Sequence, residues 1–373
     1  MEPDRLDRLR GRPLPLRHTA RTISALAANP GCARRALLDA SGTDKVKVAA
    51  RAGFPAPSGQ SEFAIARGNA FEARVKEDGA APLLALLREH LGLDVTEARY
   101  DDLSDTGGEG NERRYHRTRE LLAGADDNGA GGTMIDHPLL RLEVGGRYAY
   151  LEPDLVAFQV RGQFHVVEIK SFPVIDGQAE PAKVAAAAIQ SAVYVLALRD
   201  LLGDDELVHH ETVLVCPENF SGRPVAVSLD VRRQLTVLRR QLSRIARITD
   251  LADLYPGDLT FDLDPDPGTG APRRPPEELR AAVGAVDANY APECLSTCEM
   301  SYLCREEARG TTGALGKPVR EDFGGVEQVT EALELARGAT PPPERAEAAQ
   351  KLRRAAALRA EILGETMIPG ETT

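Results

Sequence analysis

The stretch of sequence that decides the fold is RYAYLEPDLVAFQVRGQFHVVEIK, residues 147–170. β-Branched and aromatic residues dominate both of its halves, and Gly162 supplies a turn between them. These features predict an antiparallel hairpin with strands at 147–160 and 163–170.

Three polar side chains interrupt this apolar hairpin: Asp154 on the first strand, and Glu168 and Lys170 on the second. Glu168 and Lys170 are two residues apart, so both point to the same face. Because neighbouring strands lie about 4.8 Å apart, the three side chains can converge. Paired carboxylates suit Mg²⁺ or Mn²⁺, and an adjacent lysine can orient or deprotonate water or neutralise charge. An ordinary Glu–Lys pair at a sheet edge is the alternative interpretation.

The strongest predicted helix covers residues 181–202, with Pro181 in its first turn. Gln190 and Tyr194 lie four residues apart and share one face of this helix. Taken alone, this Q-x-x-x-Y pair is typical of any helix surface. Two strands and another helix are predicted to follow, at 211–216, 224–229 and 230–249.

In this order, the PD dipeptide, the Glu-x-Lys triplet and the Q-x-x-x-Y pair resemble the PD-(D/E)xK nuclease superfamily, specifically its RecB-like branch. The resemblance covers about residues 20–305. It implies an α/β fold of the restriction-endonuclease-like type, in which helices flank a mixed β-sheet. It also implies metal-dependent hydrolysis of phosphodiester bonds in DNA.

The resemblance assigns a role to each matching residue. Asp154, Glu168 and the Ile169 carbonyl are expected to hold the metal. Lys170 is expected to position and activate the attacking water. The Q-x-x-x-Y pair is expected to shape the site and contact substrate.

The family pattern also has G-x-x-x-His on an upstream helix, where the histidine helps to bind metal. The matching segment is Gly68-Asn-Ala-Phe-Glu72, within a helix predicted at 61–77. Glu72 therefore replaces the histidine, and its carboxylate still suits a hard cation. A surface glutamate on an amphipathic helix is the alternative.

The chain has five cysteines, an odd number that does not suggest a disulfide framework. Three of them form Cys294-x₃-Cys298-x₅-Cys304, and Cys32 lies far upstream. This arrangement resembles the iron–sulfur nucleases of the RecB-like branch, which include AddB-type helicase-nucleases and small exonucleases of CRISPR adaptation. The resemblance implies that these four thiolates hold a [4Fe–4S] cluster joining the two ends of the nuclease domain.

The first gap of the cysteine motif is one residue longer than the family's usual C-x₂-C-x₅-C. Zn²⁺, which four thiolates also bind well, is therefore an alternative, as are unligated thiols. Cys216 ends an apolar strand and is predicted to be a small buried hydrophobic residue.

The formal net charge of −11 argues against a protein that coats nucleic acid. Residues 1–53 are nevertheless basic, and we expect Arg34 and Arg35 to contact substrate phosphates. The Gly/Asp-rich segment at about 104–132 contains NERRYHRTRELLAG, which fits a surface insertion or, alternatively, a basic helix facing DNA.

No apolar run reaches the roughly 20 residues of a membrane helix, and the first residues carry charges without an apolar core. We therefore expect a cytoplasmic protein with no membrane partner. The segment GTTGALGKPV lacks the Walker A spacing, so motor activity is not expected.

We predict a nuclease domain at 1–310, closed by the four-cysteine cluster and containing a Pro-rich loop at 255–276. A helical appendage at 311–373 is expected to dock a protein partner. The predicted function is a metal-dependent DNA nuclease, with exonuclease action on single-stranded DNA or DNA ends, in DNA repair, CRISPR adaptation or phage defence.

Two alternatives belong to other classes of protein. The first is a catalytically weak or silent nuclease-like subunit that binds DNA or assembles a larger complex, as Glu72 and the appendage suggest. The second is a zinc-stapled binding domain in which the PD…E-x-K spacing is accidental.

Overall fold

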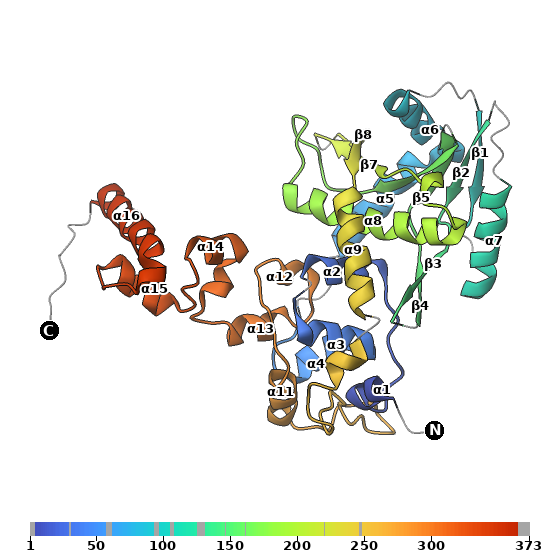
Figure 1. Ribbon diagram of the computed structural model, residues 1–373. Coiled ribbons are helices and arrows are strands. Elements are labelled where there is room, and N and C mark those ends of the chain that lie inside the picture. The colour runs from blue at the N-terminus through green and yellow to red at the C-terminus, as the bar shows by residue number, and fades with distance from the viewer. Residues whose placement is uncertain are drawn as a thin grey trace.

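The structure is a computed structural model. It describes residues 4–29, 31–56, 62–92, 97–104, 108–124, 131–145, 147–160, 162–219, 221–245 and 248–364. It shows an α/β protein in which helices flank a mixed six-stranded sheet and a helical region follows toward the C-terminus (Figure 1). This architecture confirms the predicted fold class.

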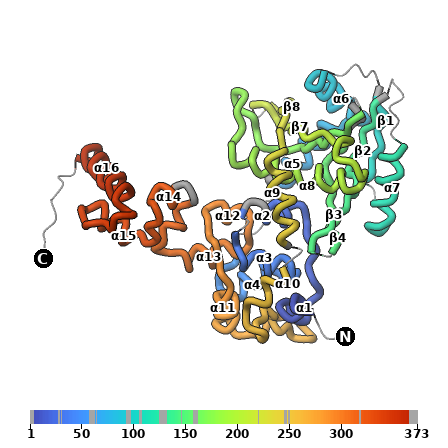
Figure 2. Tube along the Cα trace, viewed as in Figure 1, coloured from blue at the N-terminus to red at the C-terminus, as the bar shows by residue number. Residues whose placement is uncertain are grey.

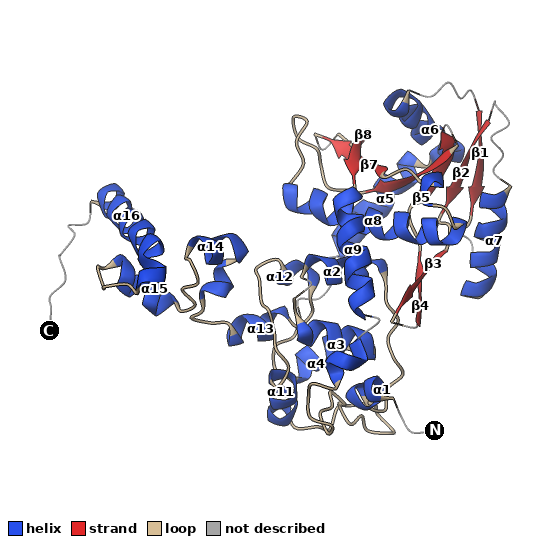
Figure 3. Ribbon diagram, in the orientation of Figure 1, coloured by secondary structure: helices blue, strands red, loops and turns tan. Residues whose placement is uncertain are grey.

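The six strands of the main sheet lie in the order β1-β2-β5-β6-β7-β8 (Figure 3). The pairs β1–β2 and β6–β7 are parallel, and the other neighbouring pairs are antiparallel. The bounds are β1 Glu97–Asp102, β2 Gly131–Asp136, β5 Leu155–Val160, β6 Gln163–Ile169, β7 Glu211–Glu218 and β8 Arg223–Asp230.

The predicted hairpin is correct for residues 155–170 and wrong for residues 147–154, which were expected to belong to its first strand. Strands β5 and β6 pair antiparallel, as predicted. Residues 147–151 instead form β4 (Arg147–Leu151), which pairs with β3 (Leu140–Val144) in a separate two-stranded sheet. Pro153 has no N–H to donate to a ladder, so the chain bends there. Asp154 consequently lies in a bend just before β5 rather than within a strand.

Buried residues alternate between the two faces of the sheet. Along β5 and β6, Val156 and Val166 belong to one apolar cluster, whereas Leu155 and Val167 belong to another. The first cluster packs under α8 (Pro181–Leu202), α2 (Ala20–Ala28) and α9 (Arg232–Ile245). The second packs under α5 (Glu62–Val75) and α6 (Glu77–Leu91).

Helix α8 has the bounds that the sequence predicted, with proline in its first turn and Gly203 as a left-handed C-cap. It crosses between the parallel strands β6 and β7, and buries a continuous run from Ser191 to Leu198. Among the described residues, it is the one helix long and apolar enough to cross a membrane by length and composition. Since 56% of its most apolar window is buried, it resembles the core helix of a folded domain.

A second core lies beside the sheet and brings together segments from both ends of the predicted nuclease domain (Figure 1). The Arg5 guanidinium donates to the carbonyls of Tyr255, Pro256 and Gly257, which ties the N-terminal helix to the predicted Pro-rich loop. The helices of this second core are α1 Arg5–Arg10, α3 Ala33–Ser41, α4 Lys45–Arg51, α10 Ile248–Ala252, α11 Pro276–Gly284, α12 Cys294–Thr297 and α13 Ser301–Glu307.

The last helices form a small cluster of their own, drawn away from the sheet in Figure 2. Val326, Ala332, Leu335 and Ala349 make its buried centre. The helices are α14 Lys317–Asp322, α15 Val329–Ala336 and α16 Ala346–Leu363, with 3₁₀ turns η2 Thr312–Leu315 and η3 Pro343–Arg345.

The segment predicted as an insertion contains α7 (Asn111–Ala123) and the start of β2. Tyr115, Thr118 and Leu122 bury one face of α7. The helix packs beside β3, so this part of the segment belongs to the folded body. Residues 105–107 and 125–130 of the predicted insertion lie outside the described residues.

Candidate active site

Three side chains meet where β5 begins and β6 ends. Oδ2 of Asp154 accepts a hydrogen bond of 2.7 Å from the backbone N–H of Ile169. The Lys170 ammonium contacts a carboxylate oxygen of Glu168 and lies 4.0 Å from Oδ2 of Asp154. The antiparallel pairing of the two strands thus brings together the two carboxylates and the lysine that the sequence singled out.

Glu168 is fully buried, with an exposed fraction of 0%. Apart from the contact with the Lys170 ammonium, neither of its carboxylate oxygens has a hydrogen-bond partner among the described residues. Burial, reinforced by the charge of Asp154, raises the pKa of Glu168 to about 8. A buried carboxylate with so few partners calls for a cation, and oxygen-preferring divalent ions fit this donor set.

The charges around Lys170 determine its protonation state and so limit what it can do in the site. Burial opposes its charge, but the neighbouring Glu168 and Asp154 carboxylates raise the pKa of Lys170 above its ordinary value. The ammonium form is therefore retained at neutral pH. Of the roles the sequence left open, this form suits orienting water and neutralising charge rather than accepting a proton.

Helix α8 closes the site from one face of the sheet. The Gln190 side-chain amide donates to the Tyr194 hydroxyl at 2.9 Å, so the two residues of the Q-x-x-x-Y pair act as one unit. Tyr194 is buried, and burial together with the negative field of Glu168 raises its pKa well above the ordinary value. The hydroxyl thus stays protonated beside the carboxylates.

A second polar group adjoins the first. Ligand atoms of Glu72 on α5, Asp136 at the end of β2 and the following His137 all lie within 4.8 Å of one another. Nε2 of His137 is 3.3 Å from Glu72, and Nδ1 is 2.8 Å from Asp136. Among the described residues, this is the one compact group of three such side chains that could hold a metal ion.

Lys76 lies between the members of this second group. Its ammonium donates to Glu72 and Asp136, each at 2.5 Å, and to the backbone carbonyl of Asp154 at 3.0 Å. Burial disfavours the charge on Asp136, but hydrogen bonds from His137 and Lys76 lower its pKa below the ordinary value. Asp154 therefore links the two polar groups. Its carboxylate lies beside Glu168 and Lys170, and its backbone carbonyl accepts from Lys76.

Sequence reasoning missed Lys76, Asp136 and His137. Lys76 and Asp136 are 60 residues apart, and no spacing rule links them. One backbone signal accompanies them: His137 has a φ of 47°, in the left-handed region that a histidine seldom adopts. Such strain clusters at functional sites, because the surrounding structure must hold it in place.

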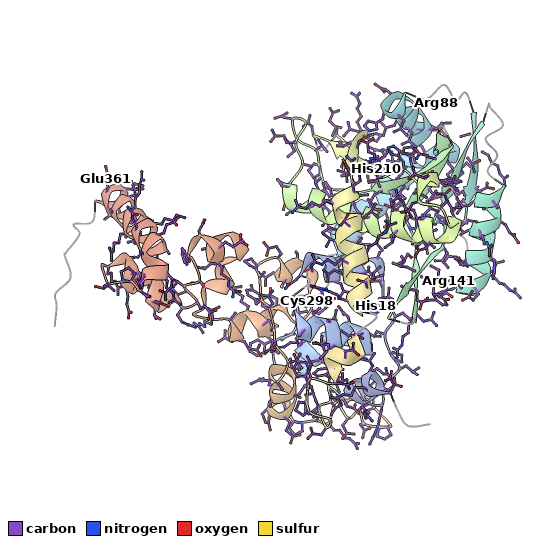
Figure 4. The ribbon with its side chains drawn as sticks, viewed as in Figure 1. His18, Arg88, Arg141, His210, Cys298 and Glu361 are labelled. Carbon is purple, nitrogen blue, oxygen red and sulfur yellow. The ribbon has the colours of Figure 1, made fainter. Side chains whose placement is uncertain are left out.

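The four predicted cluster cysteines lie in or beside the second core, whose residues do not include the carboxylates of the pocket. Cys294 and Cys304 are buried there, and Cys32 is the N-cap residue of α3. Cys298 packs against the same core (Figure 4). Among the described residues, their sulfurs do not form a group within 4.8 Å, so they are not clustered as a metal site. Tetrahedral zinc with bonds of about 2.3 Å would draw sulfurs closer than this. Cys216 is buried under α8, as predicted.

The prediction that Arg34 and Arg35 contact phosphate is corrected by their burial, since each is 3% exposed. The Arg34 guanidinium donates to Sγ of Cys304 at 3.2 Å and to Glu307 at 2.5 Å. The Arg35 guanidinium donates to the Thr297 carbonyl at 2.7 Å. Both side chains are therefore directed at the cysteine-bearing helices rather than at solvent.

Comparisons with known proteins add little to this geometry. No family model matches the chain, and no curated protein matches it. Weak structural similarity links it to a crystal structure described as "Putative exonuclease" from Eubacterium rectale. The two are 12% identical, with a TM-score of 0.31, and the match covers 62% of this chain and 80% of that one. The function must therefore be argued from the site itself.

Proposed function

We propose that this protein is a metal-dependent DNA nuclease of the RecB-like PD-(D/E)xK type. One observation carries the proposal: Glu168 is buried almost without polar partners, beside Asp154 and Lys170, at the meeting point of two strands. Asp154, Glu168 and the Ile169 carbonyl would hold Mg²⁺ or Mn²⁺, with Glu72 adjacent. When bound, the ion supplies an activated water and charge stabilisation for phosphodiester hydrolysis.

The chain's own residues would do the remaining work. The Lys170 ammonium orients water and offsets the negative charge that develops on the phosphate. The hydrogen bond from Ile169 fixes the Asp154 carboxylate. The hydroxyl of Tyr194, held by Gln190, borders the carboxylates from the α8 side.

The direct test is degradation of end-labelled single-stranded DNA in Mn²⁺ by the wild type, Asp154→Ala and Lys170→Ala. We expect turnover by the wild type and loss in both variants. Asp230→Ala and Lys351→Ala, which remove exposed charges on β8 and α16, are matched controls expected to retain activity. Equal activity in all five proteins would reject the site. Labelling either end in turn distinguishes exonuclease from internal cutting.

We also propose that Cys32, Cys294, Cys298 and Cys304 hold a [4Fe–4S] cluster in the loaded protein. The set of four thiols supports this proposal. Burial raises the pKa of Cys298 and Cys304, and the neighbouring Arg35 and Arg34 guanidiniums offset part of that rise. Anaerobic purification followed by iron and sulfide analysis tests it. Zinc without iron would favour the zinc-stapled alternative, and absence of both metals would leave unligated thiols.

A silent nuclease-like subunit is the second candidate, and Lys76 favours it. Its ammonium occupies the space among Glu72, Asp136 and the Asp154 carbonyl, where a cation would otherwise bind. This candidate predicts DNA binding without turnover in any divalent ion. It also predicts a stable complex with another protein. The appendage proposed at 311–373, which follows the proposed nuclease domain at 1–310, would bind that partner. We propose that the complex is cytoplasmic.

A further inference from the structure

We propose that the outer face of the β3–β4 hairpin and the exposed face of α7 form a platform that binds single-stranded DNA beside the catalytic pocket. The proposal rests on the proposed function for its substrate class. Its position rests on the surface alone, and we call this surface the hairpin platform. It comprises Arg113, Arg117, Arg141, Tyr148 and Tyr150.

The hairpin has one apolar face and one face of aromatic and charged residues. Its five inward residues are buried under α8, namely Leu140, Leu142, Val144, Ala149 and Leu151. The alternate residues Arg141, Glu143, Tyr148 and Tyr150 point away from that core. The outer face therefore carries large rings and a guanidinium that the core does not need.

The guanidinium of Arg141, labelled in Figure 4, lies over two aromatic rings. It lies 4.1 Å from the centre of the Tyr148 ring and 4.4 Å from that of Tyr115 on α7. Tyr148 remains 48% exposed, and Arg17 lies 5.9 Å from the Tyr150 ring. A rigid, exposed ring backed by a cation is the arrangement on which nucleic-acid bases stack.

The charge of this region is opposite to that of the whole chain. Helix α7 and the two hairpin strands carry six arginines and three glutamates, against a net charge of −11 for the chain. Arg113 and Arg117 are exposed on one face of α7. Of the glutamates, Glu112 already accepts from the Tyr150 hydroxyl and pairs with Arg141 at 3.4 Å. The surface thus complements a phosphate backbone.

The hairpin is joined directly to the catalytic pocket at its base. Strand β3 begins three residues after His137, and β4 ends three residues before Asp154. Arg114 of α7 pairs at 3.0 Å with Glu152, in the short link to Asp154. Five-residue strands extend about 17 Å, enough to support a few nucleotides next to the pocket.

The chemistry favours a single strand over a duplex. Stacking on Tyr148 requires base faces that are not already covered by neighbouring base pairs. Arginines spaced along α7 can contact the phosphates of single-stranded or duplex DNA. The exposed ring of Tyr148 can stack only on the bases of a single strand. A duplex would use the charges and leave the ring without function.

The first test measures binding of fluorescent single-stranded DNA by anisotropy in EDTA, where no cutting occurs. Tyr148→Val keeps strand propensity and removes the ring, and should weaken binding roughly fivefold to a hundredfold. Tyr148→Phe keeps the ring and should bind within about twofold of the wild type. Tyr302→Ala, at an exposed tyrosine on α13, is the matched control and should not change binding.

The second test examines the pairing of arginines with phosphates. Arg113→Gln with Arg117→Gln should make the plot of log affinity against log salt shallower, by about 0.7 for each phosphate that is no longer neutralised. Arg354→Gln on α16 should leave this slope unchanged. Unchanged affinity in Tyr148→Val, or an equal weakening for a duplex of the same sequence, would overturn the hairpin platform.

Failure of the hairpin platform is separable from failure of the proposed nuclease. Hydrolysis of a small chromogenic phosphodiester needs the pocket but not the hairpin. Tyr148→Val that loses single-strand binding yet retains this hydrolysis supports the platform. A wild type that binds single strands through Tyr148 without hydrolysing either substrate keeps the platform and rejects the nuclease.

Discussion

The carboxylate pocket and the cysteine region are two polar clusters built in opposite ways. In the pocket, strand geometry places buried Glu168 beside Asp154 although few polar groups of the protein satisfy it. In the cysteine region, short helices and loops carry the thiols, and Arg34 and Asn29 donate to the sulfurs of Cys304 and Cys294.

This difference shows how each cluster depends on a ligand. A sheet holds its side chains in register regardless of what binds, so the pocket keeps its unsatisfied carboxylate. Thiols on short helices can settle against an apolar core and nearby donors when no metal draws them together. The pocket should therefore respond to single substitutions through chemistry, and the cysteine region mainly through metal content.

The largest expected effect follows substitution of the buried carboxylate. Glu168→Gln keeps the shape and removes the charge, so we expect nuclease turnover to fall by about 10³-fold or more, equivalent to several kcal/mol of transition-state stabilisation. Single-turnover cleavage of labelled single-stranded DNA in Mn²⁺ measures this loss. Glu206→Gln, at an exposed residue, is the control. A residual rate within tenfold of the wild type would contradict the assigned role.

The sequence predicted this pocket because Asp154, Glu168 and Lys170 lie close together in one β-rich stretch. The β-branched and aromatic residues on both sides of the Gly162 turn predicted the β5–β6 pairing, and the four-residue spacing predicted one helix face for the Q-x-x-x-Y pair. Strand β1 (EARYDD) was missed, because an edge strand can be polar and then has no apolar alternation to reveal it.

The next effect concerns Lys76, the internal cation of the second polar group. Lys76→Met removes the ammonium that donates to both Glu72 and Asp136, and leaves His137 between the two carboxylates. We expect a loss of about 3 kcal/mol in the free energy of unfolding in EDTA. Mn²⁺ should restore much of this loss by replacing the ammonium. Urea unfolding with and without metal measures both.

Lys351→Met is the matched control, since Lys351 forms an exposed pair with Glu347 on α16 and should contribute little. Stability of Lys76→Met that does not respond to Mn²⁺ would show that this group is a structural ion pair. This part of the pocket would then resemble the cysteine region, because groups of the protein itself would satisfy its polar side chains.

A smaller effect on stability comes from protonation of a histidine buried in the sheet, away from the carboxylates. His165 on β6 is 6% exposed and stacks on His209 with ring centres 4.7 Å apart. Burial, followed by the charge of His209, lowers the pKa of His165 to about 4. The unfolded chain, with a pKa near 6.5, binds the proton first. Stability should therefore fall by about 2 kcal/mol as pH drops from about 6.5 to 4.

Unfolding at a series of pH values measures this slope. His165→Phe removes the titrating group and should flatten the curve in that window, whereas His116→Phe, at an exposed residue on α7, should not. An unchanged slope in His165→Phe would assign the pH dependence to other groups.

The cysteine region shows where sequence reasoning reached less far. Its motif predicted that four cysteines form one site. All four lie in or beside one core, but among the described residues their sulfurs do not form a compact group. The motif did not predict that Arg34 and Arg35 serve this core, because a basic pair after Cys32 has the same pattern whether it faces solvent or the interior. Segments far away in sequence decide the burial: Arg34 donates to the Val286 carbonyl, just after α11, and to Glu307 at the end of α13.

The smallest expected effect on stability is that of Cys298→Ser in protein freed of metal. Cys298 is only partly buried, and serine nearly matches its size, so we expect a change below about 1 kcal/mol in urea unfolding. Cys216→Ser should cost more, because it buries a hydroxyl in the apolar cluster under α8. Iron content should reverse this order, with Cys298→Ser losing iron and Cys216→Ser retaining it. If Cys298→Ser retains full iron, Cys298 is not a ligand, and the cysteine region would owe its arrangement to packing alone.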